Sequence, residues 1–89
     1  MIKAIKTLVN KAFINGAAHA SRGNHCFKCV PGNPEVVFYY HDNPVCVLNF
    51  RTKSFKLDHC GYNTISTTRT LNEYRYELTA RGFTCSQVK

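Results

Sequence analysis

The spacing of the apolar residues changes period twice along this chain, and this change limits the folds open to it. Apolar side chains recur every three to four residues over 2–14 and 68–81, and every two residues over 36–60. A period near 3.6 lines one face of a helix, whereas a period of two lines one face of a strand. We therefore predict an α+β fold with one helix before the strands and one after them.

The first predicted helix, over 2–14, is amphipathic. Its apolar face carries Ile2, Ile5, Leu8, Val9, Ala12 and Phe13. Three lysines lie on the opposite face: Lys3, Lys6 and Lys11. Asn15-Gly16 is a stop signal, and the small, polar residues 17–24 indicate a loop or one weak turn.

The second predicted helix covers 68–81. A hydroxyl-rich segment precedes it, so Thr67 or Thr68 is the expected N-cap, and Gly82 is the natural stop. Its inner stripe is formed by Leu71, Tyr74 and Leu78. This stripe is expected to pack on the same sheet face as the first helix.

Between the helices the alternation predicts an antiparallel meander of three to five strands. The expected strands between the helices lie near 25–30, 36–41, 44–50 and 54–60. A short last strand over 83–86 is expected after the second helix. Two-residue turns at Asp42-Asn43 and Thr52-Lys53 would pair Tyr39 with Cys46, Val37 with Leu48, Leu48 with Leu57, Phe50 with Phe55, and Cys46 with His59. Eighty-nine residues hold one such core, so we expect a single domain over 1–89.

The chain is basic. It has 12 Lys and Arg against five Asp and Glu, a formal net charge of +7, and the first 34 residues contain no acid. Such a balance favours nucleic acid, an acidic protein or anionic lipid as partner, although a solvated charged face is the alternative. The first helix lacks Trp and its apolar stripe suits core packing, so we expect no membrane binding.

The residues expected to bind a polyanion fall in three groups. Cations cluster at a hairpin turn, on the first helix and at the start of the second, where hydroxyls and an amide add donors to the helix N-terminus. The predicted set is Lys3, Lys6, Lys11, Arg51, Lys53, Lys56, Tyr62, Thr67, Thr68, Arg69 and Asn72. Tyr62 and Tyr76 are the candidates for base stacking. The alternative is that these threonines only cap the helix.

Metal binding and catalysis have weaker support. Cys26-x-x-Cys29, with His59 and Cys60 as a second half, has ligand types that zinc uses, but only one such Cys pair is present, so we predict no metal and no cofactor. The odd number of cysteines and the absence of an export signal favour reduced thiols in the cytosol.

Two residue pairs could be assembled into a catalytic site. His41-Asp42 is expected at a tight turn, and His59 and Cys60 would point to opposite faces of a strand. The sequence also lacks a phosphate-binding glycine loop. We therefore expect a protein that is not an enzyme.

Four short segments follow one another in a recognisable order: Tyr40-His41, Gly61-Tyr62-Asn63-Thr64, Thr67-Thr68-Arg69 and Leu71-Asn72. In this stretch, about half of the chain, the sequence resembles a family of short tailed-bacteriophage proteins with no assigned activity. Cys60 and Thr70 depart from that pattern, which usually has a small and a basic residue there. The resemblance implies a phage accessory protein in the cytoplasm of the infected bacterium. Together with the charge, it suggests nucleic-acid binding through phosphates, or alternatively docking on an acidic host protein.

Overall fold

The computed structural model describes residues 3–14, 19–29, 32–62 and 64–89. Along the chain the elements are α1 (Lys3–Ile14), β1 (His19–Arg22), β2 (His25–Cys29), β3 (Glu35–Tyr40), β4 (Asn43–Asn49), β5 (Ser54–Leu57), α2 (Ile65–Ala80) and β6 (Thr84–Val88). The α+β fold is confirmed. Three sequence predictions lie outside the described residues: the apolar role of Ile2, the stop at Asn15-Gly16 and the strand position of Val30.

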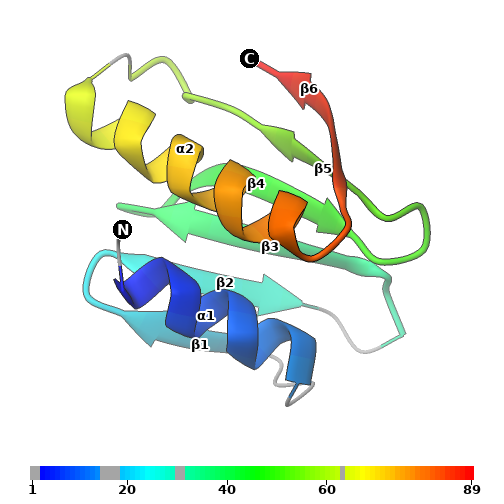
Figure 1. Cartoon of the computed structure of the whole chain (residues 1–89). Helices are drawn as coiled ribbons and strands as arrows, with labels where there is room; N and C mark the ends of the chain where they lie inside the picture. The colour runs from blue at the N-terminus through cyan, green and yellow to red at the C-terminus, as the bar shows by residue number, and fades with distance from the viewer. Residues whose placement is uncertain (1–2, 15–18, 30–31, 63) are drawn as a thin grey trace.

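Six strands form one mixed sheet in the order of the sequence (Figure 1). β1 to β5 are antiparallel neighbours, but β6 runs parallel to β5. The predicted antiparallel meander of at most five strands is therefore wrong in its count and in its last pairing. A parallel neighbour requires a crossover connection, and α2 supplies it between β5 and β6.

The additional strand is β1, which sequence analysis interpreted as a loop or weak turn. Its four residues are too few and too polar to show an apolar period. Their place in the sheet comes from the two-residue turn Gly23-Asn24, which pairs Arg22 with His25. Gly23 has a positive φ of 61°, a conformation that glycine adopts without steric cost.

Both helices cover the same face of the sheet and run in the same direction (Figure 1). α1 contacts β1 and β2, whereas α2 contacts β4 and β6. The predicted stripe of Leu71, Tyr74 and Leu78 is buried against this face, together with the apolar face of α1. In the part of the chain that the structure describes, the opposite face of the sheet carries no helix, and the core lies on the helix-covered side.

The β3–β4 register differs from the prediction by one residue. The turn consists of His41 and Asp42, both with positive φ, rather than Asp42-Asn43. This turn, together with a register shift between Phe38 and Tyr39, pairs Phe38 with Cys46, and Val36 with Leu48. A one-residue shift moves a strand's side chains to the other face. The predicted pairings of Tyr39 and Val37 were thus wrong, and both residues lie on the uncovered face.

An irregular pairing of β3 with β4 beside this turn places two adjacent residues of β4 in the core. The register shifts between Phe38 and Tyr39, where Tyr39 pairs with Pro44 instead of Val45. Val45 and Cys46 are consequently both buried, although they are adjacent in a strand. The prediction that Cys46 packs as a small hydrophobic residue is confirmed.

The β4–β5 connection is a four-residue loop over 50–53 instead of the predicted two-residue turn. The Asn49 side chain stabilises it, because its Oδ1 accepts hydrogen bonds from the amides of Arg51 and Thr52 at 2.9 and 3.1 Å. Leu48 consequently pairs with Phe55, and Cys46 with Leu57. The predicted partners of Leu48 and Cys46 are therefore wrong by two residues on β5. The predicted pair of Phe50 with Phe55 is also wrong, because Phe50 lies in the loop and Phe55 pairs with Leu48.

α2 begins three residues earlier than predicted. Thr64 is the N-cap, since its Oγ1 accepts from the Thr67 amide at 3.1 Å, so the expectation of Thr67 or Thr68 was wrong. Thr67 is instead buried, and Ile65 is 81% exposed. The rotation that buries Thr67 also turns Leu71 and Tyr74 toward the sheet. The predicted stop at Gly82 is confirmed, with φ at 87°.

The position of the N-cap can be tested by paired substitutions. Thr64→Ala should lower the free energy of unfolding by about 1 kcal/mol, because the Thr67 amide loses its acceptor. Thr68→Ala, at an exposed position, should change it by less than about 0.5 kcal/mol. Urea unfolding followed by circular dichroism measures both. A larger loss in Thr68→Ala would contradict the observed helix start.

Tyr74 provides a test of the core. Its side chain is fully buried, and its hydroxyl has no hydrogen-bond partner among the described residues. Burying an unpaired hydroxyl costs free energy, so Tyr74→Phe should raise the free energy of unfolding by up to about 1 kcal/mol. Tyr76→Phe, whose side chain is exposed, should leave it unchanged. Destabilisation by Tyr74→Phe would mean that the hydroxyl has a partner.

Candidate functional site

One end of the molecule gathers the starts of both helices and two hairpin turns (Figure 1). The two turns are joined directly, because the His41 amide donates to the Asn24 carbonyl at 3.0 Å. We call this region the helix-start end. It consists of Lys3, Arg22 to His25, Tyr40 to Asn43, Tyr62, and Thr64 to Arg69.

The helix-start end is electropositive. An α-helix carries a partial positive charge at its N-terminus, and neither α1 nor α2 has an acid in its first turn to offset that charge. Three exposed cations add to it, namely Lys3, Arg22 and Arg69, against the single exposed acid Asp42. Such an end attracts anions.

A ladder of rings connects the two turns. His25 and Tyr40 are stacked, with centroids 4.9 Å apart and planes at 17°, and Tyr40 and His41 are 4.3 Å apart at 52°. The Nδ1 atom of His25 is buried without a hydrogen-bond partner among the described residues. Burial, together with the charge of His41, lowers the pKa of His25 below its ordinary value. A neutral imidazole is therefore favoured in the folded protein.

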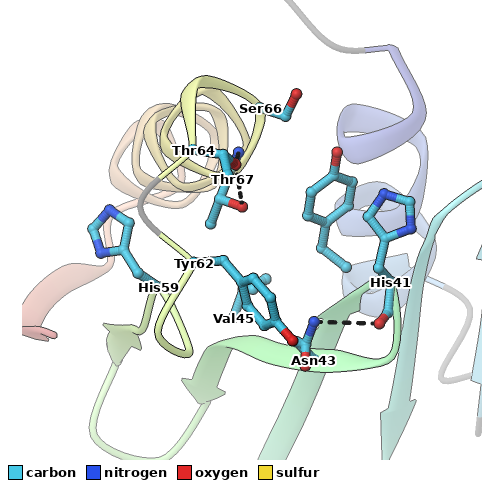
Figure 2. Close-up of a pocket in the computed structure, with 9 residues that line it drawn as sticks. His41, Asn43, Val45, His59, Tyr62, Thr64, Ser66 and Thr67 are labelled. Carbon is cyan, nitrogen blue, oxygen red and sulfur yellow. Dashed lines mark hydrogen bonds between the residues drawn. The ribbon is translucent and has the colours of Figure 1, made fainter.

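A cavity of about 450 Å³ lies between the ring ladder and the start of α2 (Figure 2). It is lined by Tyr40, His41, Asn43, Val45, His59, Tyr62, Thr64, Ser66 and Thr67. In Figure 2, His41 and Asn43 lie across the view from His59, with Ser66 and Thr67 at the start of α2 above Tyr62. None of these side chains is that of a Lys, Arg, Asp or Glu.

The loop after β5 holds His59 and Tyr62 in place. The His59 ring Nδ1 is 2.7 Å from the Lys89 carbonyl oxygen, and the Tyr62 amide donates to the His59 carbonyl at 2.9 Å. Cys60 and Gly61 between them both have positive φ. This turn leaves the Tyr62 side chain 55% exposed at the mouth of the cavity.

A second hollow of about 400 Å³ adjoins the other side of the ring ladder. Its lining comes from the first turn of α1 and from the β1–β2 turn: Lys3, Ala4, Thr7, Arg22, Gly23, Asn24 and His25. His25 belongs to this hollow and stacks on Tyr40, which belongs to the first. The two hollows thus share one aromatic wall, and two of the exposed cations flank the second.

The residues predicted to bind a polyanion do not form one surface. The helix-start end contains Lys3, Tyr62, Thr67, Thr68 and Arg69, although Thr67 is buried and its amide is taken by Thr64. Lys6 and Lys11 lie further along α1, and Asn72 lies on the exposed side of α2.

The hairpin cations are remote from this end. The Lys53 carbonyl accepts from the Thr84 amide at 3.0 Å, which places Arg51 and Lys53 beyond the other end of α2. Sixteen helical residues, about 24 Å, separate the two ends. Lys56 lies on the uncovered sheet face opposite Val47.

Sequence analysis missed several residues of the helix-start end. Arg22, His25 and Tyr40 come together there only through the pairing of β1, β2 and β3. The Gly23-Asn24 turn was a signal that could have placed Arg22 beside His25. Thr64 was missed because four nearby hydroxyl residues offer equivalent caps.

The candidate metal ligands are separated. Cys26 and Cys29 are three residues apart in a strand and therefore face opposite sides of the sheet, with Cys29 packed against the core. Cys60 Sγ donates to the Pro44 carbonyl oxygen at 3.2 Å. Within the described residues, no three His, Cys, Asp or Glu side chains come together as a metal site would require.

The predicted strand over 54–60 is shorter in the structure, which changes the setting of His59 and Cys60. β5 ends at Leu57 rather than at residue 60, so these two residues lie in a loop and strand alternation does not apply to them. Burial and the nearby Asp58 raise the pKa of the Cys60 thiol. A thiol with a raised pKa is a poor nucleophile near neutral pH.

The chain was compared with protein-family models, curated proteins and solved structures. No protein-family model, curated protein or solved structure matches the chain. Neither helix in the described part of the chain is both long and apolar enough to cross a membrane.

The state of His25 can be tested by pH. The unfolded chain takes up a proton near pH 6.5, whereas the lowered pKa delays protonation in the folded protein. Stability should therefore fall as the pH drops through 6.5 toward the folded-state pKa. His25→Phe keeps a ring on Tyr40 and should lose less stability over this range. Thermal unfolding at several pH values compares the two proteins, and parallel curves would contradict the assignment.

Proposed function

We propose that this protein binds nucleic acid through phosphate contacts at the helix-start end. The observation that supports this most is the convergence of two helix N-termini, neither offset by a first-turn acid, with Lys3, Arg22 and Arg69. Backbone amides at helix starts and exposed Lys or Arg side chains are the groups that contact phosphates in proteins. Binding of this kind is largely independent of sequence.

The two hollows suggest how a strand would lie. Its phosphates would pass from Arg69 on α2 toward Arg22 and Lys3 beside α1, across the mouth of the cavity. The cations there reinforce the positive helix ends, and Asp42 is the only exposed acid among the described residues of that end. In line with the resemblance noted above, we propose that this binding serves a phage accessory role in the cytoplasm of an infected bacterium.

Salt dependence with charge-matched variants tests the proposal. The affinity for a mixed-sequence single-stranded DNA should fall steeply with salt, because bound cations displace counterions from the phosphates. Arg22→Gln and Arg69→Gln should each make the slope of log affinity against log salt shallower by roughly 0.7. Arg51→Gln and Lys53→Gln remove the same charge at the other end and should leave the slope unchanged. Fluorescence anisotropy measures all five proteins.

Two results would reject the proposal in different ways. Equal effects of all four variants would mean that general charge, not the helix-start end, attracts DNA. Absence of binding to DNA and RNA at low salt would reject nucleic acid altogether. Stoichiometric recovery of one acidic bacterial protein after nuclease treatment would then favour the alternative of docking on a host protein.

A further inference from the structure

We propose that the cavity beside Tyr62 receives one unpaired base of a single-stranded nucleic acid. This inference rests on the proposed function, in which the surrounding cations contact the phosphates. In addition, the protein would distinguish single strands from duplexes, because it holds one base in the cavity, away from the neighbouring stacked bases.

The cavity has the size and walls that a planar ring requires. Its volume of about 450 Å³ falls within the range of small-molecule sites. Tyr62 stands at its mouth with 55% of its surface exposed, and it does not belong to the hydrophobic core. Tyr40, another lining residue, is braced by ring contacts with His25 and His41. Bases in single strands are commonly bound by stacking on such rings.

The lining combines apolar surface with hydrogen-bonding groups and carries no carboxylate, ammonium or guanidinium group. Asn43 uses its Nδ2 to donate to the His41 carbonyl at 3.3 Å, and its Oδ1 atom is an acceptor for a donor on a base edge. The Ser66 hydroxyl lies at the opposite wall in Figure 2. A lining with hydrogen-bonding groups and without Lys or Arg suits an uncharged base better than a phosphate.

The Lys and Arg side chains lie outside the cavity, where a backbone would pass. Arg69 follows the α2 residues of the lining, and Arg22 and Lys3 line the adjoining hollow. A cavity lined without Lys, Arg, Asp or Glu, with exposed cations around it, matches the chemistry of a nucleotide strand, whose bases are neutral and whose phosphates are anionic. A base in a duplex is stacked and paired, so it enters only after extrusion, which costs free energy.

The experiment separates the base from the phosphates. Anisotropy titrations compare a mixed-sequence single strand, an abasic strand of equal length and the corresponding duplex. The protein should bind the single strand roughly tenfold more tightly than the abasic strand or the duplex. Tyr62→Leu should lose this preference while its affinity for the abasic strand stays unchanged.

Tyr76→Leu is the matched control. Tyr76 is 63% exposed on α2, lies outside the cavity lining and is the other exposed tyrosine considered for stacking. It should keep the preference for the base-containing strand. Thermal unfolding confirms that both variants are folded, which is expected because both side chains lie at the surface.

Several results would overturn the base site alone. These are equal affinity for abasic and normal strands, equal losses on both strands in Tyr62→Leu, or an equal loss in Tyr76→Leu. If the salt slopes of the Arg22 and Arg69 variants still behave as proposed, phosphate binding stands without the base site. Absence of binding to every strand at low salt overturns both proposals.

Discussion

The packing of α2 against the centre of the sheet determines where the helix starts and therefore where the candidate site lies. The Tyr74 ring sits 4.9 Å from Phe38, which in turn lies 5.8 Å from Phe27, so one aromatic row joins the helix to β3 and β2. Because α2 runs back along the sheet (Figure 1) and the chain then returns as β6 parallel to β5, the helix starts at the end of the sheet where β5 ends. This constraint brings Thr64 and Tyr62 next to the β3–β4 turn.

The two helices are fastened to each other at their other ends. The Arg81 guanidinium donates to the Glu77 carbonyl and to Glu77 Oε1 at 2.7 and 2.8 Å, and it also bonds Asn10 Oδ1 on α1. The same group lies over the ring of Phe13, which makes edge contacts with Phe50 and Phe83. Burial of a carboxylate is costly unless it is paired, and Arg81 provides the pair.

The sequence predicted the helices better than the strands, for a physical reason. In α2, the 3.6-residue period separates Leu71, Tyr74 and Leu78 from polar neighbours, so its buried face was readable. In β3, all five residues from Val36 to Tyr40 are apolar or aromatic, and alternation cannot choose a face. The choice is made by the left-handed turn at His41-Asp42 and by the irregular pairing of Phe38 and Tyr39.

The candidate site was predicted only in part, because sequence proximity is a poor guide to shared surfaces. Arg51 and Lys53 are close to Lys56 in sequence, but the loop and strand carry them to different parts of the molecule. Arg22 and Arg69 are far apart in sequence and share one end through the His41–Asn24 hydrogen bond and the position of α2.

The positions of the acidic side chains also affect the charge of the helix-start end. Asp58 accepts from the Cys60 amide at 2.8 Å beside the cavity, and Glu77 pairs with Arg81 in the last turn of α2, so two of the five acids serve local structure. Glu35 begins β3, at the opposite end of that strand from the His41-Asp42 turn. Among the described residues of the helix-start end, the exposed cations Lys3, Arg22 and Arg69 outnumber the one exposed acid, Asp42, where the helix dipoles already point outward. At this end, charge and dipole act in the same direction on an approaching anion.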